Sequence, residues 1–164
     1  MIKTVKKRRK QRKTDYKIRL NLLKSGIPRI VIRKTNKYII IQEVISKEAR
    51  DKVIFGLTSR DLIEYGWPKE GEGSLKSIAA AYLTGYLAGK KISEKEGKKS
   101  FIIDLGLQRN VHGSRIFASI KGLIDGGLKI NADSKAFPSE KRIKESVNKE
   151  DIKKNFDKIK LNIK

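Results

Sequence analysis

Cysteine is absent from this 164-residue chain, and its absence excludes disulfide bonds, thiolate metal sites and cysteine nucleophiles. The one histidine, His112, has no second histidine to join it, which argues against a transition-metal site. No apolar run approaches the roughly 18 residues of a membrane span, and no hydrophobic region follows the charged N-terminus as it would in a signal peptide. We therefore expect a cytoplasmic protein with no metal, cofactor or membrane partner.

Acidic residues are scarce as well: 18 Asp and Glu face 40 Lys and Arg, and the net charge is +22. Residues 1–37 hold fifteen of the basic side chains and one acid, Asp15, so a local charge of +14 lies at one end. This concentration of positive charge is expected to bind a polyanion. Nucleic acid is the commonest such partner, and its binding is favourable because phosphates neutralised by Lys or Arg release counterions. Anionic lipid is disfavoured, since residues 1–13 include only three apolar side chains.

The first 25 residues are expected to form a basic arm and a short helix. Like charges in residues 1–13 repel one another, so this segment should be disordered alone and become ordered on nucleic acid, although a solvated tail is the alternative. Thr14 is a plausible cap for a helix that runs to about Lys24, and Asp15 suits the positive end of its dipole.

A basic hairpin is predicted to follow the arm. Residues 29–33 alternate as a strand, residues 35–37 form a turn, and residues 38–45 return as a second strand. The hairpin would present Arg29, Arg33 and Lys34 beside Tyr38. Such a face suits unpaired RNA, where Arg and Tyr stack on bases, and an ordinary exposed sheet face is the alternative.

The rest of the chain alternates between strand and helix signals. Hydrophobic spacing predicts strands at 52–58 and 99–105, helices at 74–92 and 114–125, a loop at 62–73, a short helix at 139–144 and a last helix from Asn148 to 163. Trp67 is expected to pack against neighbouring side chains while the edge of its indole ring stays in contact with water. Gly85 and Gly89 would allow close approach of another backbone. The apolar stripe of the last helix could dock on its own domain or on a partner.

These elements indicate an α/β (α+β) protein, with a mixed sheet of about four strands, two long helices packed on it and a ribonuclease-H-like half topology. We expect residues 1–25 to be the arm, 26–130 the core domain and 131–164 a helical extension. A metal-dependent nuclease is the alternative function. It would require converging acids, whereas Asp104, Glu43, Asp61 and Asp125 share no spacing. No nucleophile and base pair is evident either, so we predict a binding protein with no small-molecule substrate.

Several blocks of sequence then match one family in order. They are residues 13–29, 33–37, 80–91, 104–109, 113–115, 121–122, 125–128 and 137–143. Over residues 8–145 the chain resembles the universal large-subunit ribosomal protein family eighteen in its archaeal form, which binds 5S rRNA. The resemblance implies a structural, non-enzymatic component of the central protuberance that anchors 5S rRNA to 23S rRNA beside neighbouring ribosomal proteins.

The resemblance also implies which residues contact RNA. Carried over by position, they are Arg8, Arg9, Arg12, Lys13, Tyr16, Arg19, Arg29, Arg33, Lys34, Asn36, Lys37, Arg109 and Arg115. His112 lies between the last two, at a strand-to-helix turn that attracts anions. We include it as a candidate RNA contact, with an ordinary polar loop residue as the alternative.

Overall fold

A computed structural model describes residues 6–11, 13–68, 74–97, 99–145 and 150–163. The strands are β1 (Arg29–Lys34), β2 (Ile39–Lys47), β3 (Arg50–Thr58), β4 (Ser100–Asp104) and β5 (Lys129–Ile130). The helices are α1 (Lys7–Lys10), α2 (Tyr16–Lys24), η1 (Ser59–Tyr65), α3 (Ile78–Glu96), α4 (Arg115–Asp125), η2 (Ser134–Ala136), α5 (Glu140–Glu145) and α6 (Glu150–Asn162), where η marks 3₁₀ geometry.

The described strands form one mixed sheet in the order β3-β2-β1-β4-β5. The first three strands are antiparallel, whereas β4 runs parallel to β1 and β5 parallel to β4. The mixed α/β class is confirmed. The sheet has one strand more than expected, because β5 contains only two residues and is too short to show alternation. The ribonuclease-H-like description stays a prediction.

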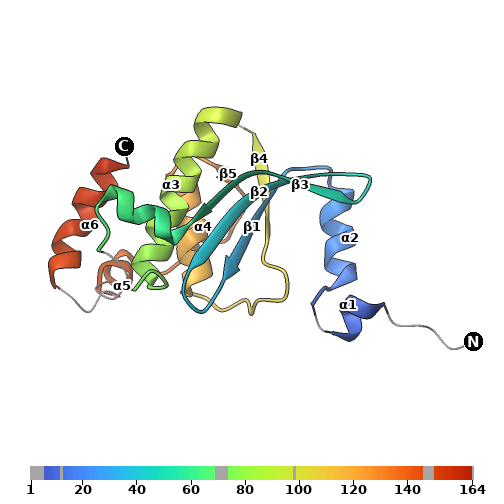
Figure 1. Cartoon of the computed structure of the whole chain (residues 1–164), viewed down its shortest axis with the longest axis horizontal. Coiled ribbons are helices and arrows are strands. Elements are labelled where there is room, and N and C mark those ends of the chain that lie inside the picture. Colours follow the sequence, from blue (N-terminus) through green and yellow to red (C-terminus); the bar gives the residue numbers. More distant parts are fainter. Residues whose placement is uncertain (1–5, 12, 69–73, 98, 146–149, 164) are drawn as a thin grey trace, which may run out of the picture.

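Two helices, α3 and α4, cover one face of the sheet (Figure 1). Alternate residues of β1 and β2, among them Ile30, Ile32 and Ile41, are fully buried beneath them. The helices approach unusually closely: a Cβ at Gly85 would lie 2.2 Å from the Ser119 carbonyl oxygen. The close approach that the sequence predicted at Gly85 is therefore confirmed, and its partner is α4.

The N-terminal helices lie at one end of the molecule, and α5 and α6 lie at the other (Figure 1). Asp15, not Thr14, caps α2, because its carboxylate accepts hydrogen bonds from the amides of Lys17 and Ile18. The cap prediction was thus one residue early. Lys7–Lys10 forms one helical turn without a buried residue, whereas the sequence predicted disorder there.

Three further predictions for the segment after β3 differ from the structure. The expected loop from residue 62 begins inside η1, and residues 69–73 of that loop lie outside the described part. Trp67 is only 2% exposed, which confirms a packing role, but its indole nitrogen is buried too, so the expected wet edge was wrong. Helix α3 begins at Ile78 after the cap Ser77, four residues later than predicted, and extends to Glu96.

The C-terminal helix α6 docks on its own domain, which settles the alternative that the sequence left open. Phe156 stacks on Tyr82 with ring centroids 5.9 Å apart, and Ile159 is buried. Lys160 Nζ donates to the Tyr82 hydroxyl at 2.9 Å. The expected cap Asn148 lies outside the described residues. Within the described part, no helix is long and apolar enough to cross a membrane.

Among the described residues, Glu43 on β2 is a charged residue buried without a counter-charge bonded to it: it is 1% exposed, and its Oε1 has no hydrogen-bond partner among them. Burial, followed by the nearby charge of Glu96, raises the pKa of Glu43 above its ordinary value of 4.5. The folded chain therefore binds this proton more tightly than the unfolded chain, so Glu43 destabilises the fold increasingly as pH rises from about 4.5 through the raised pKa.

A Glu43→Gln variant should consequently be more stable than the parent at pH 7, by about 1 kcal/mol, since a neutral amide avoids burial of a charge. Urea denaturation of both proteins between pH 4 and pH 7 measures the difference. The advantage of the variant should shrink toward pH 4, where Glu43 is mostly protonated in both states. A difference that stays constant over this range would contradict the assigned ionisation.

Candidate nucleic-acid interface

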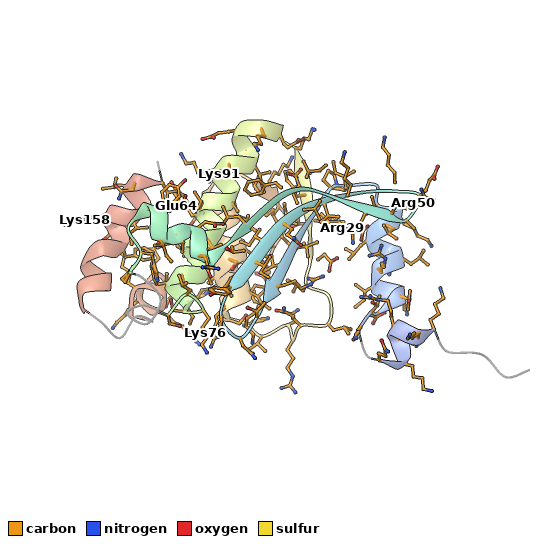
Figure 2. All side chains as sticks on the ribbon, viewed as in Figure 1. Arg29, Arg50, Glu64, Lys76, Lys91 and Lys158 are labelled. Atoms are coloured by element: carbon orange, nitrogen blue, oxygen red, sulfur yellow. The ribbon has the colours of Figure 1, made fainter. Side chains whose placement is uncertain are left out.

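The face of the sheet opposite α3 and α4 carries a buried ion-pair cluster centred on Arg29. Its guanidinium donates to Asp104 Oδ2 at 3.0 Å, to Asp51 Oδ1 at 2.7 Å and to Ser46 Oγ at 2.9 Å. Figure 2 shows Arg29 within the sheet, near the end beside α2. The residue is 2% exposed, so its side chain does not reach the surface. This placement assigns Arg29 a structural role in place of the RNA contact that the resemblance implied.

Asp104 links this cluster to the loop that follows β4. Its Oδ1 accepts from Arg33 Nη2 at 3.1 Å and from the amide of Gly106 at 2.8 Å. Arg33 also donates to the Asp104 carbonyl at 2.7 Å and remains about one-third exposed. The carboxylate is therefore committed to two arginines and a loop amide, and it fixes the start of the segment that carries Arg109 and His112.

The same contacts weaken the nuclease alternative. Asp104 pairs with arginines, Asp61 belongs to the capping box of η1, and Asp125 accepts from the Tyr82 hydroxyl at 2.7 Å. No group of three or more potential metal ligands occurs in the part of the chain that the structure describes. Asp104, Asp61 and Asp125 are held by separate structural contacts, Glu43 is buried on β2, and these four acids do not converge.

Helix α2 is joined to the β2–β3 hairpin by Arg19. Arg19 Nη1 lies 2.8 Å from Asp51 Oδ2, and Nη2 donates to the Ala49 carbonyl at 3.4 Å. Burial opposes ionisation of Asp51, but hydrogen bonds from Arg19 and Ser46 and the charge of Arg29 outweigh it and hold its pKa below the ordinary value. Because Arg19 remains one-third exposed, it can meet a phosphate only while sharing its charge with Asp51.

The described part of the arm presents its cations to solvent. Arg8, Arg9 and Lys13 are exposed, and Arg8 Nε donates to Thr14 Oγ1 at 2.9 Å. Tyr16 is half-buried, with Lys6 Nζ 4.6 Å from the centre of its ring. Arg12 lies outside the described residues. The arm thus offers charge together with one aromatic ring.

The turn of the β1–β2 hairpin is the second exposed group. Lys34, Asn36 and Lys37 are all exposed there. Thr35 Oγ1 accepts from the amide of Tyr38 at 2.9 Å and donates to the Tyr38 carbonyl at 2.8 Å, which closes the turn. The turn therefore holds two cations and an amide at the edge of the molecule.

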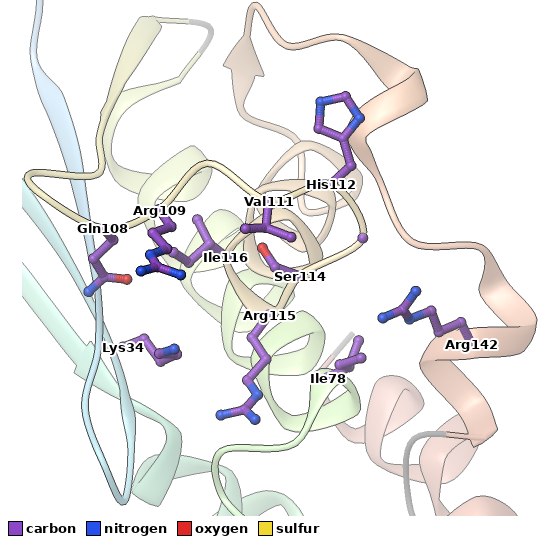
Figure 3. Close-up of a pocket in the computed structure, with 11 residues that line it drawn as sticks. Lys34, Ile78, Gln108, Arg109, Val111, His112, Ser114, Arg115, Ile116 and Arg142 are labelled. Atoms are coloured by element: carbon purple, nitrogen blue, oxygen red, sulfur yellow. The ribbon is translucent and has the colours of Figure 1, made fainter.

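The third group surrounds a hollow of about 510 Å³ beside the N-terminus of α4 (Figure 3). We call it the basic hollow. Its lining residues are Lys34, Ile78, Gln108, Arg109, Val111, His112, Gly113, Ser114, Arg115, Ile116 and Arg142. None of these described residues is acidic. His112 is exposed and meets Phe117 edge-on, with ring centroids 5.9 Å apart.

The structure therefore brings Lys34 of the hairpin together with Arg109, His112 and Arg115, which lie more than 70 residues further along the chain. It also adds Arg142, which the sequence-based set missed. Arg142 belongs to the block 137–143 that supports the family resemblance, so that block was the available signal. In Figure 3, Lys34 and Arg109 lie on one side of the hollow and Arg142 on the other.

Comparison with known proteins also supports the family resemblance that the sequence indicates. Residues 2–101 and 90–133 match the family described as "Ribosomal large subunit proteins 60S L5, and 50S L18". "Large ribosomal subunit protein uL18" of Korarchaeum cryptofilum is 44% identical over 138 residues, covering 84% of this chain and 68% of the relative. The Methanoregula boonei protein of the same name is 41% identical, covering 84% and 76%, and that of Methanothermobacter thermautotrophicus is 35% identical, covering 93% and 81%.

Proposed function

The chain belongs to the family of ribosomal large-subunit proteins 60S L5 and 50S L18, and from this premise we propose that it binds 5S rRNA and helps to anchor it to 23S rRNA in the central protuberance. Its role is structural, in keeping with relatives that are named as ribosomal proteins. Neighbouring large-subunit proteins are the further partners in this proposal.

The observation that carries the proposal is the division of the cations into paired and available ones. Arg29 is buried between two carboxylates, while Arg19 and Arg33 each share a carboxylate and stay partly exposed. Among the described residues, the other cations of the three exposed groups make no ion pair with a carboxylate; they are Arg8, Arg9, Lys13, Lys34, Lys37, Arg109, Arg115 and Arg142. Side chains of this second kind can neutralise phosphates without first breaking an internal ion pair.

The proposed RNA-contacting set follows from this division. It comprises Arg8, Arg9, Lys13, Tyr16, Lys34, Asn36, Lys37, Arg109, His112, Arg115 and Arg142, with Arg19 and Arg33 in shared roles. Tyr16 and the arginines can also stack on unpaired bases. The ion-pair cluster contributes by holding α2, the hairpin and the loop after β4 in fixed relation, so that less ordering is required on binding.

Deleting residues 1–13 tests the proposal. We expect the full chain to bind a 5S rRNA transcript more tightly than a control RNA of equal length in a gel-shift titration at 150 mM salt. The deletion should weaken 5S rRNA binding about tenfold or more, because eight cations are lost. The circular dichroism spectrum of the remaining chain should change little, since no residue of α1 is buried.

Two outcomes would count against the proposal. Equal affinity of the full chain for 5S rRNA and for the control RNA would leave only a general polyanion binder. Loss of the folded spectrum on deletion would mean that the arm is part of the structural core. A chain lacking the positive charges of Lys129 and Lys158, both exposed and outside the proposed set, is the control for loss of charge elsewhere and should bind normally.

A further inference from the structure

The basic hollow combines features that a phosphate alone would not use. Three of its lining side chains, Ile78, Val111 and Ile116, are aliphatic, and its cations come from three separate segments. A phosphate requires only positive charge and hydrogen-bond donors. Aliphatic lining inside a ring of cations suits a ligand that is charged at one end and flat and apolar over its remaining surface.

Two polar atoms in the lining lack partners among the described residues. Gln108 Oε1 and Ser114 Oγ are both shielded from solvent, and neither makes a hydrogen bond there. Buried polar atoms are nearly always hydrogen-bonded in folded proteins, so Gln108 Oε1 and Ser114 Oγ are the two atoms of this lining that a ligand's polar groups would satisfy. Figure 3 shows Ser114 between Gln108 on one side and Arg142 on the other.

The N-terminus of α4 adds an anion-binding element. Ser114 occupies the cap position, yet its side chain makes no capping hydrogen bond. The first amides of a helix have no intrahelical acceptor and lie at the positive end of the helix dipole. With Arg109, Arg115 and Arg142 around the same hollow, the phosphate end of a ligand has both charge and directed donors.

We propose that the basic hollow holds a single unstacked nucleotide of ribosomal RNA. Its phosphate lies among the arginines and the α4 amides, and its base packs on Ile78 and Ile116. The base offers an N–H group to Gln108 Oε1 and a second polar atom to Ser114 Oγ. This inference rests on the proposed function and deepens it, because it adds a site that reads the edge of a base to contacts that otherwise bind phosphates or stack on bases.

The full chain, with labelled isoleucine methyl groups, provides the test. AMP, CMP, GMP, UMP and ribose 5-phosphate are titrated in turn, and the signals of Ile78 and Ile116 are assigned by Ile→Val variants. We expect at least one nucleotide to shift both signals and to bind at least fivefold more tightly than ribose 5-phosphate. A double variant, Gln108→Met with Ser114→Ala, should lose this preference and keep its affinity for ribose 5-phosphate.

Three results would overturn the proposal: equal affinity for the nucleotides and ribose 5-phosphate, a preference that survives in the double variant, or binding that leaves both isoleucine signals unchanged. A thermal melt of the double variant confirms that it is folded. Gel shifts with 5S and 23S rRNA transcripts distinguish failure of the nucleotide site from failure of the proposed function. Normal rRNA binding without a nucleotide preference would reject the nucleotide site alone, whereas absent rRNA binding would reject the proposed function.

Discussion

Replacing Gly122 by alanine is expected to destabilise the domain by about 3 kcal/mol or more, at the upper end of overpacking effects. A Cβ at this position would lie 2.1 Å from the Tyr82 carbonyl oxygen and 2.8 Å from the Tyr86 amide nitrogen. Both obstacles are backbone atoms of α3, so a change of rotamer cannot relieve the clash. The two helices would have to separate, and the packing between them would be lost.

Thermal denaturation measures this effect. For a chain of this size, about 3 kcal/mol corresponds to a Tm lowered by roughly 6–12 °C. Gly56→Ala is the matched control, because a Cβ there would meet only the Gln42 side chain at 3.8 Å, and its Tm should stay within about 2 °C of the parent. If Gly122→Ala melted like the control, the helices would have to be further apart than the structure shows.

The sequence could predict those features that depend on local pattern. The alternation in residues 29–33 and the 3.6-residue spacing of residues 78–92 each identify an element without knowledge of its neighbours. Gly85 could be read as a site of close approach, because nothing else explains a glycine in an apolar helix. The partner at Gly122 could not be identified, since 37 residues separate the two and no local signal connects them.

The errors have local physical causes. Thr14 and Asp15 are both good helix caps, and only the fold decides which oxygen reaches the free amides of α2. Residues 59–65 lack a helical stripe because a 3₁₀ segment has three residues per turn. Strand β5 is defined by its parallel pairing with Ser100 and Phe101, which two residues of sequence cannot reveal.

Arg29 illustrates the limit of charge counting. In the sequence Arg29 belongs to the basic segment 1–37, which contains a single acid. Every cation in that segment is therefore predicted to be able to bind phosphate. Its partners Asp51 and Asp104 lie 22 and 75 residues away and reach it only because β3 and β4 join the sheet on either side of β1 and β2. Net charge therefore predicted the partner class, while the fold decides which cations are free to meet it.

Affinity for 5S rRNA is expected to fall steeply with salt. A surface that neutralises about six to ten phosphates should lose roughly 10³ to 10⁵ in affinity between 50 and 200 mM salt, taking duplex DNA as the guide. The arm, the hairpin turn and the basic hollow together contain enough exposed cations to reach this range. Equilibrium titrations at four or five salt concentrations give the slope of log affinity against log salt.

Variants of exposed cations inside and outside the proposed interface turn this slope into a test of where the RNA binds. Neutralising Lys34, Lys37 and Arg109 together should lower the magnitude of the slope by nearly 3, because each lost phosphate contact removes about 0.9. Neutralising Lys129 and Lys158 removes exposed charge from elsewhere and should leave the slope within about 0.5 of the parent. Equal changes per charge removed in the two variants would show that the RNA responds to total charge, and the proposed interface would then be wrong.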